Sequence, residues 1–278
     1  MSLDAILASV GLLNFLALGG VVLIGLPHGA FDGAIAAYLG YAGKPLLLLR
    51  FLFLYVLIAG LVVAIWMVQP SLSLIVFLAI SIVHFGLGDA RATHGWFRLV
   101  QAVAHGGIIV AGISQSHRPE VDQIFGYLVG ADTAAVWMAV DLMSAIIGAA
   151  FLVYAWRAFW DVQWRLGMLE MLFALLLIAL LPPLVSFALY FCFVHSARHL
   201  SGIWRSAGSM FGPRILYAQS ITFTVASWVA GGVAFWWCAS EMSAESALLR
   251  VIFIGLAALT VPHMILVDAL YRKHAVSP

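Results

Sequence analysis

The sequence is poor in charged residues, which make up only 9% of its 278 residues. An ordinary soluble domain has about 25% charged residues, so there is too little polar side chain here to cover a water-soluble particle. Hydrophobic residues account for 64% of the chain. The net charge is +1 and no basic cluster is present, so a nucleic-acid partner is not expected. We therefore predict a membrane protein surrounded by lipid.

Cysteine is also scarce. Cys192 and Cys238 fall in predicted membrane spans and lack the spacing of a metal or disulfide motif. No basic stretch precedes the first apolar run, so we expect a retained first helix and not a cleaved signal peptide. Internal repeats and low-complexity linkers are not evident. We therefore predict one membrane-embedded domain over residues 1–278.

A membrane-crossing helix needs about 20 apolar residues. By this criterion the sequence predicts an all-α fold, a polytopic transmembrane helical bundle of about nine spans, within a range of eight to ten. Pro27 interrupts the first apolar run and predicts a kink there. Residues 115–132 are expected to form the longest polar loop. The predicted spans are residues 8–30, 50–69, 72–90, 97–114, 133–156, 166–181, 184–204, 215–238 and 248–270.

The basic residues predict an orientation. With nine spans, ten of the 13 Lys and Arg residues fall on one side and only Arg118 and Arg250 on the other, while Arg198 lies within a span. The positive-inside rule then places the N-terminus outside and the C-terminus in the cytoplasm. We expect the bacterial cytoplasmic (inner) membrane.

Two histidines stand one helical turn apart in an apolar segment. His195 and His199 face the same side of a helix, so both rings can reach one metal ion. The alternative is a pair of histidines bonded to backbone at a helix end. Given the predicted topology, six histidines collect between the bilayer centre and its cytoplasmic boundary, which favours a shared metal or proton-relay site. These six are His28, His84, His105, His195, His199 and His263, whereas His94, His117 and His274 are expected to be solvated.

Carboxylates and glycines accompany several of these histidines. Asp32 follows His28 by one turn and Asp89 follows His84 by five residues. A metal-bound histidine usually gives its other N–H to a carboxylate or carbonyl, so both aspartates are candidates to orient ligands. Alternatively they cap helices or pair with Arg198. Glycines beside the histidines allow the helices to approach closely at the site, or they are packing residues with no chemical part. They are Gly29, Gly86, Gly106 and Gly107.

The histidines come without thiolate ligands, so a structural zinc site is not expected. Imidazole ligands suit iron, copper, zinc or nickel. An ion buried in a dry cavity also indicates a lipid-soluble substrate.

Four motifs, taken in order, carry a family resemblance. They run between residues 25 and 268, and together they resemble the Brp/Blh family of membrane β-carotene 15,15'-dioxygenases. This resemblance implies an Fe(2+)-dependent enzyme that splits the central double bond of β-carotene with O2 into two retinal molecules. The motifs are Pro27-His28-Gly-Ala-Phe-Asp32, His84-Phe-Gly-Leu-Gly-Asp89, His195-Ser-Ala-Arg198-His199 and Pro262-His263-Met.

The resemblance also implies site roles. The iron ligands carry over onto His28, His84, His195 and His199, and no catalytic residue beyond the metal site is expected. Retinal made in the membrane is expected to pass to a rhodopsin-type apoprotein. We place the remaining candidates around the ligands or in reserve for them, namely Asp32, Asp89, His105, Arg198 and His263.

Other classes remain open from the residues alone. A di-metal oxygenase or hydroxylase acting on lipid would carry clustered histidine boxes, whereas this chain has one H-x-x-x-H and no adjacent His-His pair. A haem protein would absorb visible light as purified. A proton-coupled transporter could relay protons through Asp32, Asp89 or Asp141, and broken helices would favour it. Pro27 is the only break we expect beside a histidine.

Overall fold

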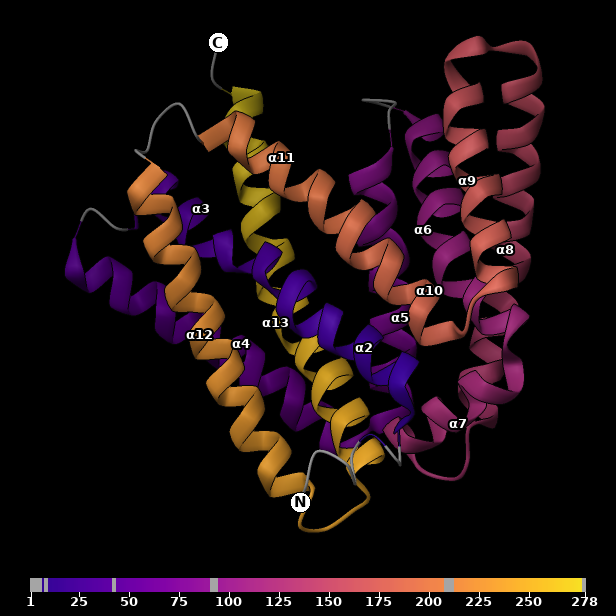
Figure 1. Cartoon of the computed structure of the whole chain (residues 1–278). Coiled ribbons are helices and arrows are strands. Elements are labelled where there is room, and N and C mark those ends of the chain that lie inside the picture. The colour runs from indigo at the N-terminus through magenta and orange to yellow at the C-terminus, as the bar shows by residue number, and fades with distance from the viewer. Residues whose placement is uncertain (1–6, 8–9, 42–43, 91–94, 208–212, 277–278) are drawn as a thin grey trace. The chain divides into compact units, whose positions relative to one another are not determined.

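The structure is a computed structural model that describes residues 7, 10–41, 44–90, 95–207 and 213–276. Within these residues the side chains of 28, 30, 202–219 and 270–276 are excepted. All regular secondary structure in the described part of the chain is helical, which confirms the all-α prediction (Figure 1).

Seven of the described helices are long and apolar enough to cross a membrane, and they coincide with seven predicted spans. Their surfaces suit lipid: on α4 only Phe51 and Trp66 are buried, while Leu46 is 77% exposed. The helices are α4 (Pro45–Val68), α5 (Pro70–Asp89), α6 (Trp96–Ser116), α8 (Ala134–Trp160), α9 (Val162–Leu180), α12 (Pro213–Cys238) and α13 (Ala244–Val276).

The other two predicted spans consist of consecutive shorter helical segments. Both contain a π-helical stretch, so neither is one regular α-helix. The count of nine spans and the orientation stay predictions. The first comprises α2 (Leu12–Gly20), the π-helix η1 (Val21–Gly25) and the 3₁₀ helix η2 (Leu26–Phe31), followed by α3 (Asp32–Tyr38). The second comprises α10 (Pro183–Leu189), the π-helix η4 (Tyr190–His195) and α11 (Ser196–Ala207).

Pro27 marks the irregular part of the first segment, as predicted. In a π-helix the carbonyl of Val22 would accept from the N–H of residue 27, which proline lacks. The indole N–H of Trp228 on α12 donates to this carbonyl instead, at 2.9 Å. A helix distant in sequence therefore satisfies the acceptor that the proline leaves open.

The prediction of a polar loop at 115–132 is wrong, because most of this segment forms helix α7 (Arg118–Val129). Pro119 lies in the first turn, where a missing N–H is harmless, and Gly130 ends the helix with φ of +98°. Val121, Phe125 and Leu128 are buried. Their helical spacing supplies the apolar face that holds α7 in place.

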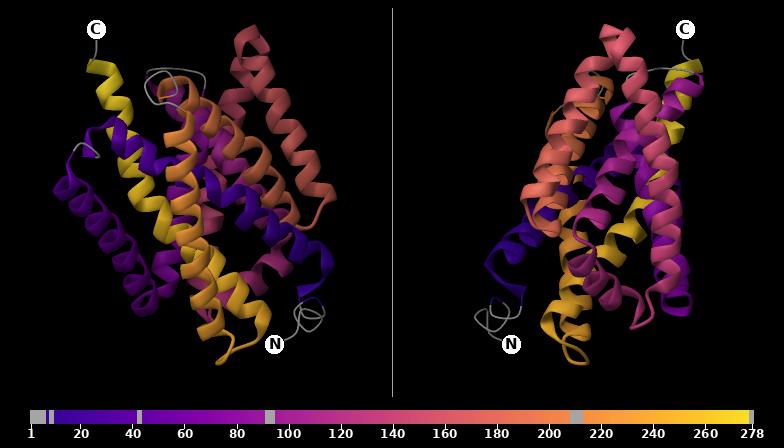
Figure 2. Two further views of the ribbon diagram at one scale, coloured as in Figure 1. Left: turned by 60° about the vertical axis from the view of Figure 1, so that its left-hand side comes forward. Right: turned by 90° about the vertical axis from the view of Figure 1, so that its right-hand side faces the viewer.

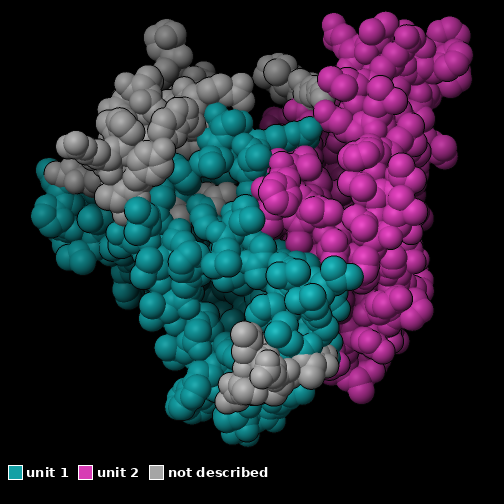
Figure 3. Space-filling view, viewed as in Figure 1, with its two compact units in different colours: residues 1–68, 196–278 teal, residues 69–195 magenta. Residues whose placement is uncertain are grey.

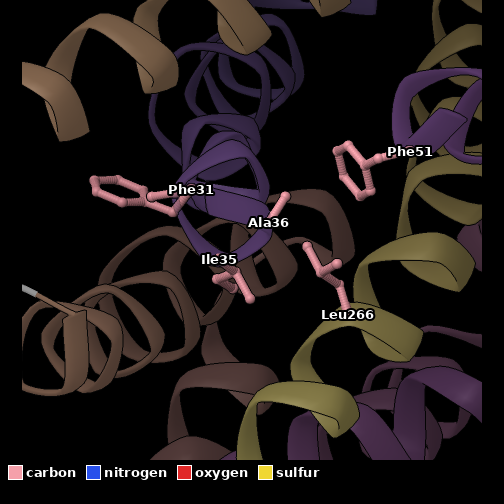
Figure 4. Packing of buried hydrophobic residues seen from close by; sticks show 6 residues of the cluster. Phe31, Ile35, Ala36, Phe51 and Leu266 are labelled. Atoms are coloured by element: carbon pink, nitrogen blue, oxygen red, sulfur yellow. The ribbon is translucent and has the colours of Figure 1, made fainter. Parts of the chain in front are cut away.

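Contacts between residues divide the chain into two compact units, coloured separately in Figure 3. Unit 1 comprises residues 1–68 and 196–278, and unit 2 comprises residues 69–195. The division leaves the single-domain prediction untested. In unit 1, α13 packs on α4, and α12 packs on η2 and α3. Its core includes Phe31, Ile35, Ala36, Phe51 and Leu266 (Figure 4).

In unit 2, α8 and α9 run side by side as an antiparallel pair (Figures 1 and 2). Helices α5 and α6 pack most closely, through glycine. A Cβ added at Gly86 would lie 1.8 Å from the carbonyl oxygen of Ala102, and one at Gly106 would lie 2.0 Å from that of Ile82. The prediction of close helix packing is confirmed at these two glycines. Gly29, in contrast, has no heavy atom within 4 Å of an added Cβ.

Candidate functional site

Unit 2 brings two of the predicted metal ligands together. The rings of His84 on α5 and His195 at the end of η4 have centroids 4.8 Å apart, at 66° to each other. His195 is buried among aromatic side chains: the ring of Phe85 lies edge-on at 4.7 Å, and that of Phe191 is stacked at 5.9 Å. The pair therefore sits in apolar surroundings.

A buried carboxylate lies close in sequence to this pair. The hydroxyl of Tyr190 donates to Oδ2 of Asp89 at 2.8 Å, and both residues are buried. Asp89 is the last residue of α5, and Tyr190 is the first residue of η4. The bond therefore fixes the two elements that carry His84 and His195 to each other. Sequence spacing does not reveal this bond, because Tyr190 and Asp89 are 101 residues apart.

Unit 1 contains a second histidine pair. The rings of His199 on α11 and His263 on α13 have centroids 4.8 Å apart, at 67°. Nδ1 of His263 lies 2.6 Å from Oδ1 of Asp32, which is completely buried. The hydroxyl of Tyr55 on α4 donates to Oδ2 of the same carboxylate at 2.7 Å. Spacing in the sequence pairs Asp32 with His28, whereas the structure bonds it to His263.

Three other predicted site residues have different outcomes. The side chain of His28, which belongs to η2, lies outside the described residues. Arg198 is partly buried on α11, and its pairing with an aspartate stays a prediction. His105 is buried on α6. It lies at the level of His84, since the adjacent Gly106 packs against the backbone of Ile82 and Gly86 on α5.

The ring of His105 contacts other helices of unit 2. It lies 5.4 Å from the ring of Tyr154 on α8, and a Cβ at Gly167 on α9 would come within 3.1 Å of its Nε2. The structure places it as a packed residue at the junction of α6, α8 and α9. Tyr154 is almost fully buried at this junction and carried no signal in the sequence.

One histidine expected to be solvated is not. His117 is half-buried, and its Nε2 lies 2.7 Å from the carbonyl oxygen of Ile178. In a regular helix that carbonyl would accept from the N–H of residue 182, but residue 182 is proline. The Nε2–H of His117 satisfies the acceptor instead. His94, and the side chain of His274, lie outside the described residues.

The sequence model described as beta-carotene 15,15'-dioxygenase matches residues 19–271. The chain belongs to this family. It is 35% identical over 265 residues to the beta-carotene 15,15'-dioxygenase of the uncultured marine bacterium 66A03, covering 95% of this chain and 96% of that protein.

A second relative in the family is more distant. The probable beta-carotene 15,15'-dioxygenase Blh of Halobacterium salinarum is 25% identical over 292 residues, covering 92% of this chain and 83% of that protein. No solved structure matches the chain. The resemblance drawn from the four motifs is therefore confirmed as family membership.

In this member of the dioxygenase family, helix irregularities adjoin the histidines. The π-helix η4 ends at His195, and Pro262 inside α13 directly precedes His263. The expectation that Pro27 is the only break beside a histidine is therefore wrong. Local π-helix and proline breaks shift backbone and side chains out of regular register, and π-bulges are frequent at functional sites.

The spacing of both histidine pairs fits ligation of a metal ion. A metal–nitrogen bond of about 2.0–2.1 Å places two ring centres on one ion about 4.5–5 Å apart when the bonds are roughly 90–110° from each other. Both pairs have centroids at 4.8 Å. No group of three His, Cys, Asp or Glu residues able to hold a metal is found within the described part of the chain. Each unit, taken by itself, supplies one pair.

Proposed function

We propose that this protein is an iron-dependent dioxygenase that cleaves the central 15,15' double bond of β-carotene with O2 to give two molecules of all-trans retinal. The reaction comes from the names of the two relatives and of the family, which extends over nearly the whole chain. The observation that carries the proposal is the presence of two histidine pairs whose ring spacing is compatible with binding of a metal ion.

The proposed ligands of Fe(2+) are His28, His84, His195 and His199. Their support is the 4.8 Å spacing of the rings of His84 and His195, together with the buried position of His195. Imidazole is a suitable ligand for ferrous iron. When bound, the iron supplies a centre able to activate O2 beside the substrate.

The protein's own part is placement and exclusion of water. Phe85 and Phe191 cover the ring of His195 with apolar surface, and Phe187 stacks on Phe191 at 5.4 Å. Aromatic walls suit a conjugated hydrocarbon, since they make dispersion contacts along it and leave few sites for water. A substrate held in this way presents one double bond reproducibly to the ligands.

The bond between Tyr190 and Asp89 contributes rigidity. It connects the end of α5 to the start of η4, so it limits relative movement of His84 and His195. Precise ligand spacing depends on such supporting bonds. Retinal carries an aldehyde but keeps a long apolar polyene, so we propose that it stays in the lipid of the cytoplasmic membrane until a rhodopsin-type apoprotein takes it up.

The test uses the purified protein in detergent micelles with β-carotene, Fe(2+) and O2. We expect two retinal molecules per β-carotene by chromatography, and one iron per chain by metal analysis. His84→Ala and His195→Ala should lose both iron and product. The matched control is His117→Gln, because this histidine bonds to a backbone carbonyl in unit 2. Turnover that persists after iron is removed by a chelator would overturn the proposal.

Metal content also separates this proposal from a di-metal hydroxylase, which would bind two ions per chain. A proton-coupled transporter gains some support from the irregular helix at η4. However, Asp141, one of its relay candidates, is exposed and forms a bidentate ion pair with Arg118. Retinal formation by purified protein would exclude a purely transporting role.

A further inference from the structure

We propose that His263 ligates a metal ion together with His199, and that Asp32 and Tyr55 orient its ring so that Nε2 is the ligating nitrogen. This inference rests on the metal site of the proposed function. It concerns unit 1 alone, in which α3, α4, α11 and α13 carry Asp32, Tyr55, His199 and His263.

The hydrogen bonds determine which ring nitrogen of His263 carries the proton. An ionised carboxylate only accepts, so Nδ1 of His263 must donate to Oδ1 of Asp32 across their 2.6 Å separation. A neutral imidazole protonated on Nδ1 has its lone pair on Nε2. This is the arrangement in which a carboxylate orients a metal-bound histidine and raises its basicity.

The burial of Asp32 supports a cation bound on the far side of the His263 ring. Asp32 has no exposed surface, and an isolated carboxylate is strongly destabilised in apolar surroundings. The hydroxyl of Tyr55 donates to its second oxygen but brings no charge. A metal ion on Nε2 of His263 would supply positive charge to the carboxylate through the imidazole. The Asp32–Tyr55 pair is therefore placed to orient and support a histidine that holds a cation.

The second observation is the position of the ring relative to His199. The centroids of His199 and His263 are 4.8 Å apart at 67°, and those of His84 and His195 are 4.8 Å apart at 66°. The two pairs thus share a spacing that fits ligands on one ion. His263 has the same relation to His199, a proposed ligand, as His84 has to His195.

Substitutions in this hydrogen-bond network should weaken metal binding to different degrees. His263→Ala removes the ligand itself. Asp32→Asn keeps the shape but removes the charge, and loss of such an orienting partner weakens metal binding by about 10–100-fold. Tyr55→Phe removes one hydrogen bond to the carboxylate but leaves its charge, so its effect should be smaller than that of Asp32→Asn.

The experiment measures metal binding without turnover. Metal-free protein in detergent micelles is titrated with Co(2+), and the visible absorption bands report affinity and ligand number. We expect His263→Ala to weaken binding and to change the bands, and added imidazole to restore the wild-type bands. A role in packing alone would not give this rescue. His117→Gln is the matched histidine control, and Tyr41→Phe is the matched tyrosine control in unit 1.

The outcomes are distinct for the two proposals. If the wild-type protein binds one ion and makes retinal while His263→Ala keeps the wild-type affinity and bands, the inference about His263 is overturned and the function stands. If the wild-type protein binds no metal, both fail. Should His263→Ala not fold, Asp32→Asn and Tyr55→Phe decide: unchanged Co(2+) affinity in both refutes the inference.

Discussion

Replacing Gly86 by Ala should separate two helices that carry the candidate site. The added Cβ would lie 1.8 Å from the carbonyl oxygen of Ala102 and 2.5 Å from its carbonyl carbon. An ordinary carbon–oxygen contact is about 3.3 Å, so α5 and α6 must move apart by roughly 1.5 Å at this point. The obstructing atoms belong to backbone, so a change of side-chain rotamer cannot relieve the contact.

The magnitude follows from two opposing terms. Overpacking a close contact destabilises by about 1–3 kcal/mol, and a backbone obstruction belongs at the upper end. Alanine gains about 1 kcal/mol over glycine as a helix former, which offsets part of the loss. We expect a net loss of about 2 kcal/mol, or a fall of roughly 4–8 °C in the midpoint of thermal unfolding.

Thermal unfolding in detergent, followed by circular dichroism, measures this change. The matched control is Gly148→Ala on α8, where an added Cβ meets no heavy atom within 4 Å. That variant should unfold at the wild-type temperature or slightly above it. Because His84 lies two residues before Gly86, the separation of α5 and α6 should also weaken Co(2+) binding. Equal unfolding temperatures for the two alanine variants would refute the reasoning.

Two further predictions concern α7 and its surroundings. His117→Ala should destabilise the protein by about 1–3 kcal/mol in the same unfolding assay, because it leaves the carbonyl of Ile178 without a donor; an unchanged midpoint would contradict this. The hydroxyl of Thr133 and the indole N–H of Trp137 lower the pKa of Asp122 below its ordinary value of 3.8. A lowered pKa in the folded state gives stability that is present above pH 3.8 and lost as the pH falls through the folded value. Protection of the α7 amides against hydrogen exchange, measured relative to the unstructured rate at each pH, should therefore fall in acid, and Thr133→Val should reduce that dependence; an equal dependence in both proteins would be evidence against it.

Periodicity and hydropathy were sufficient to find the long helices. Runs of about 20 apolar residues predict spans whatever their neighbours are, because a helix satisfies its own backbone in lipid. The π-helices could not be predicted from local sequence; in η1, for example, the carbonyl of Val22 accepts from Trp228, which is distant in the chain. Helix α7 could have been found: Pro119, Gly130 and the spacing of buried apolar residues were all readable.

The site residues were predicted from local geometry alone. His195 and His199 are four residues apart, and that they share one metal ion stays a prediction, because the observed ring contacts join His195 to His84 and His199 to His263. The partner of Asp32 could not be inferred, because His263 lies 231 residues away and Tyr55 is on another helix. Local spacing favoured His28, and only tertiary packing brings α13 to α3.

The prolines at 27 and 182 have a consequence for how this sequence can change. Each leaves a carbonyl whose donor is a ring nitrogen distant in sequence, that of Trp228 on α12 in one case and that of His117, between α6 and α7, in the other. Substitution of the donor side chain alone leaves the carbonyl oxygen without a hydrogen bond. Substitution of the proline alone restores a backbone N–H that can donate to the carbonyl, so the side-chain donor is no longer needed. Among relatives, each proline and its ring should accordingly be retained or replaced as a couple, which would mark these contacts in an alignment before any coordinates exist.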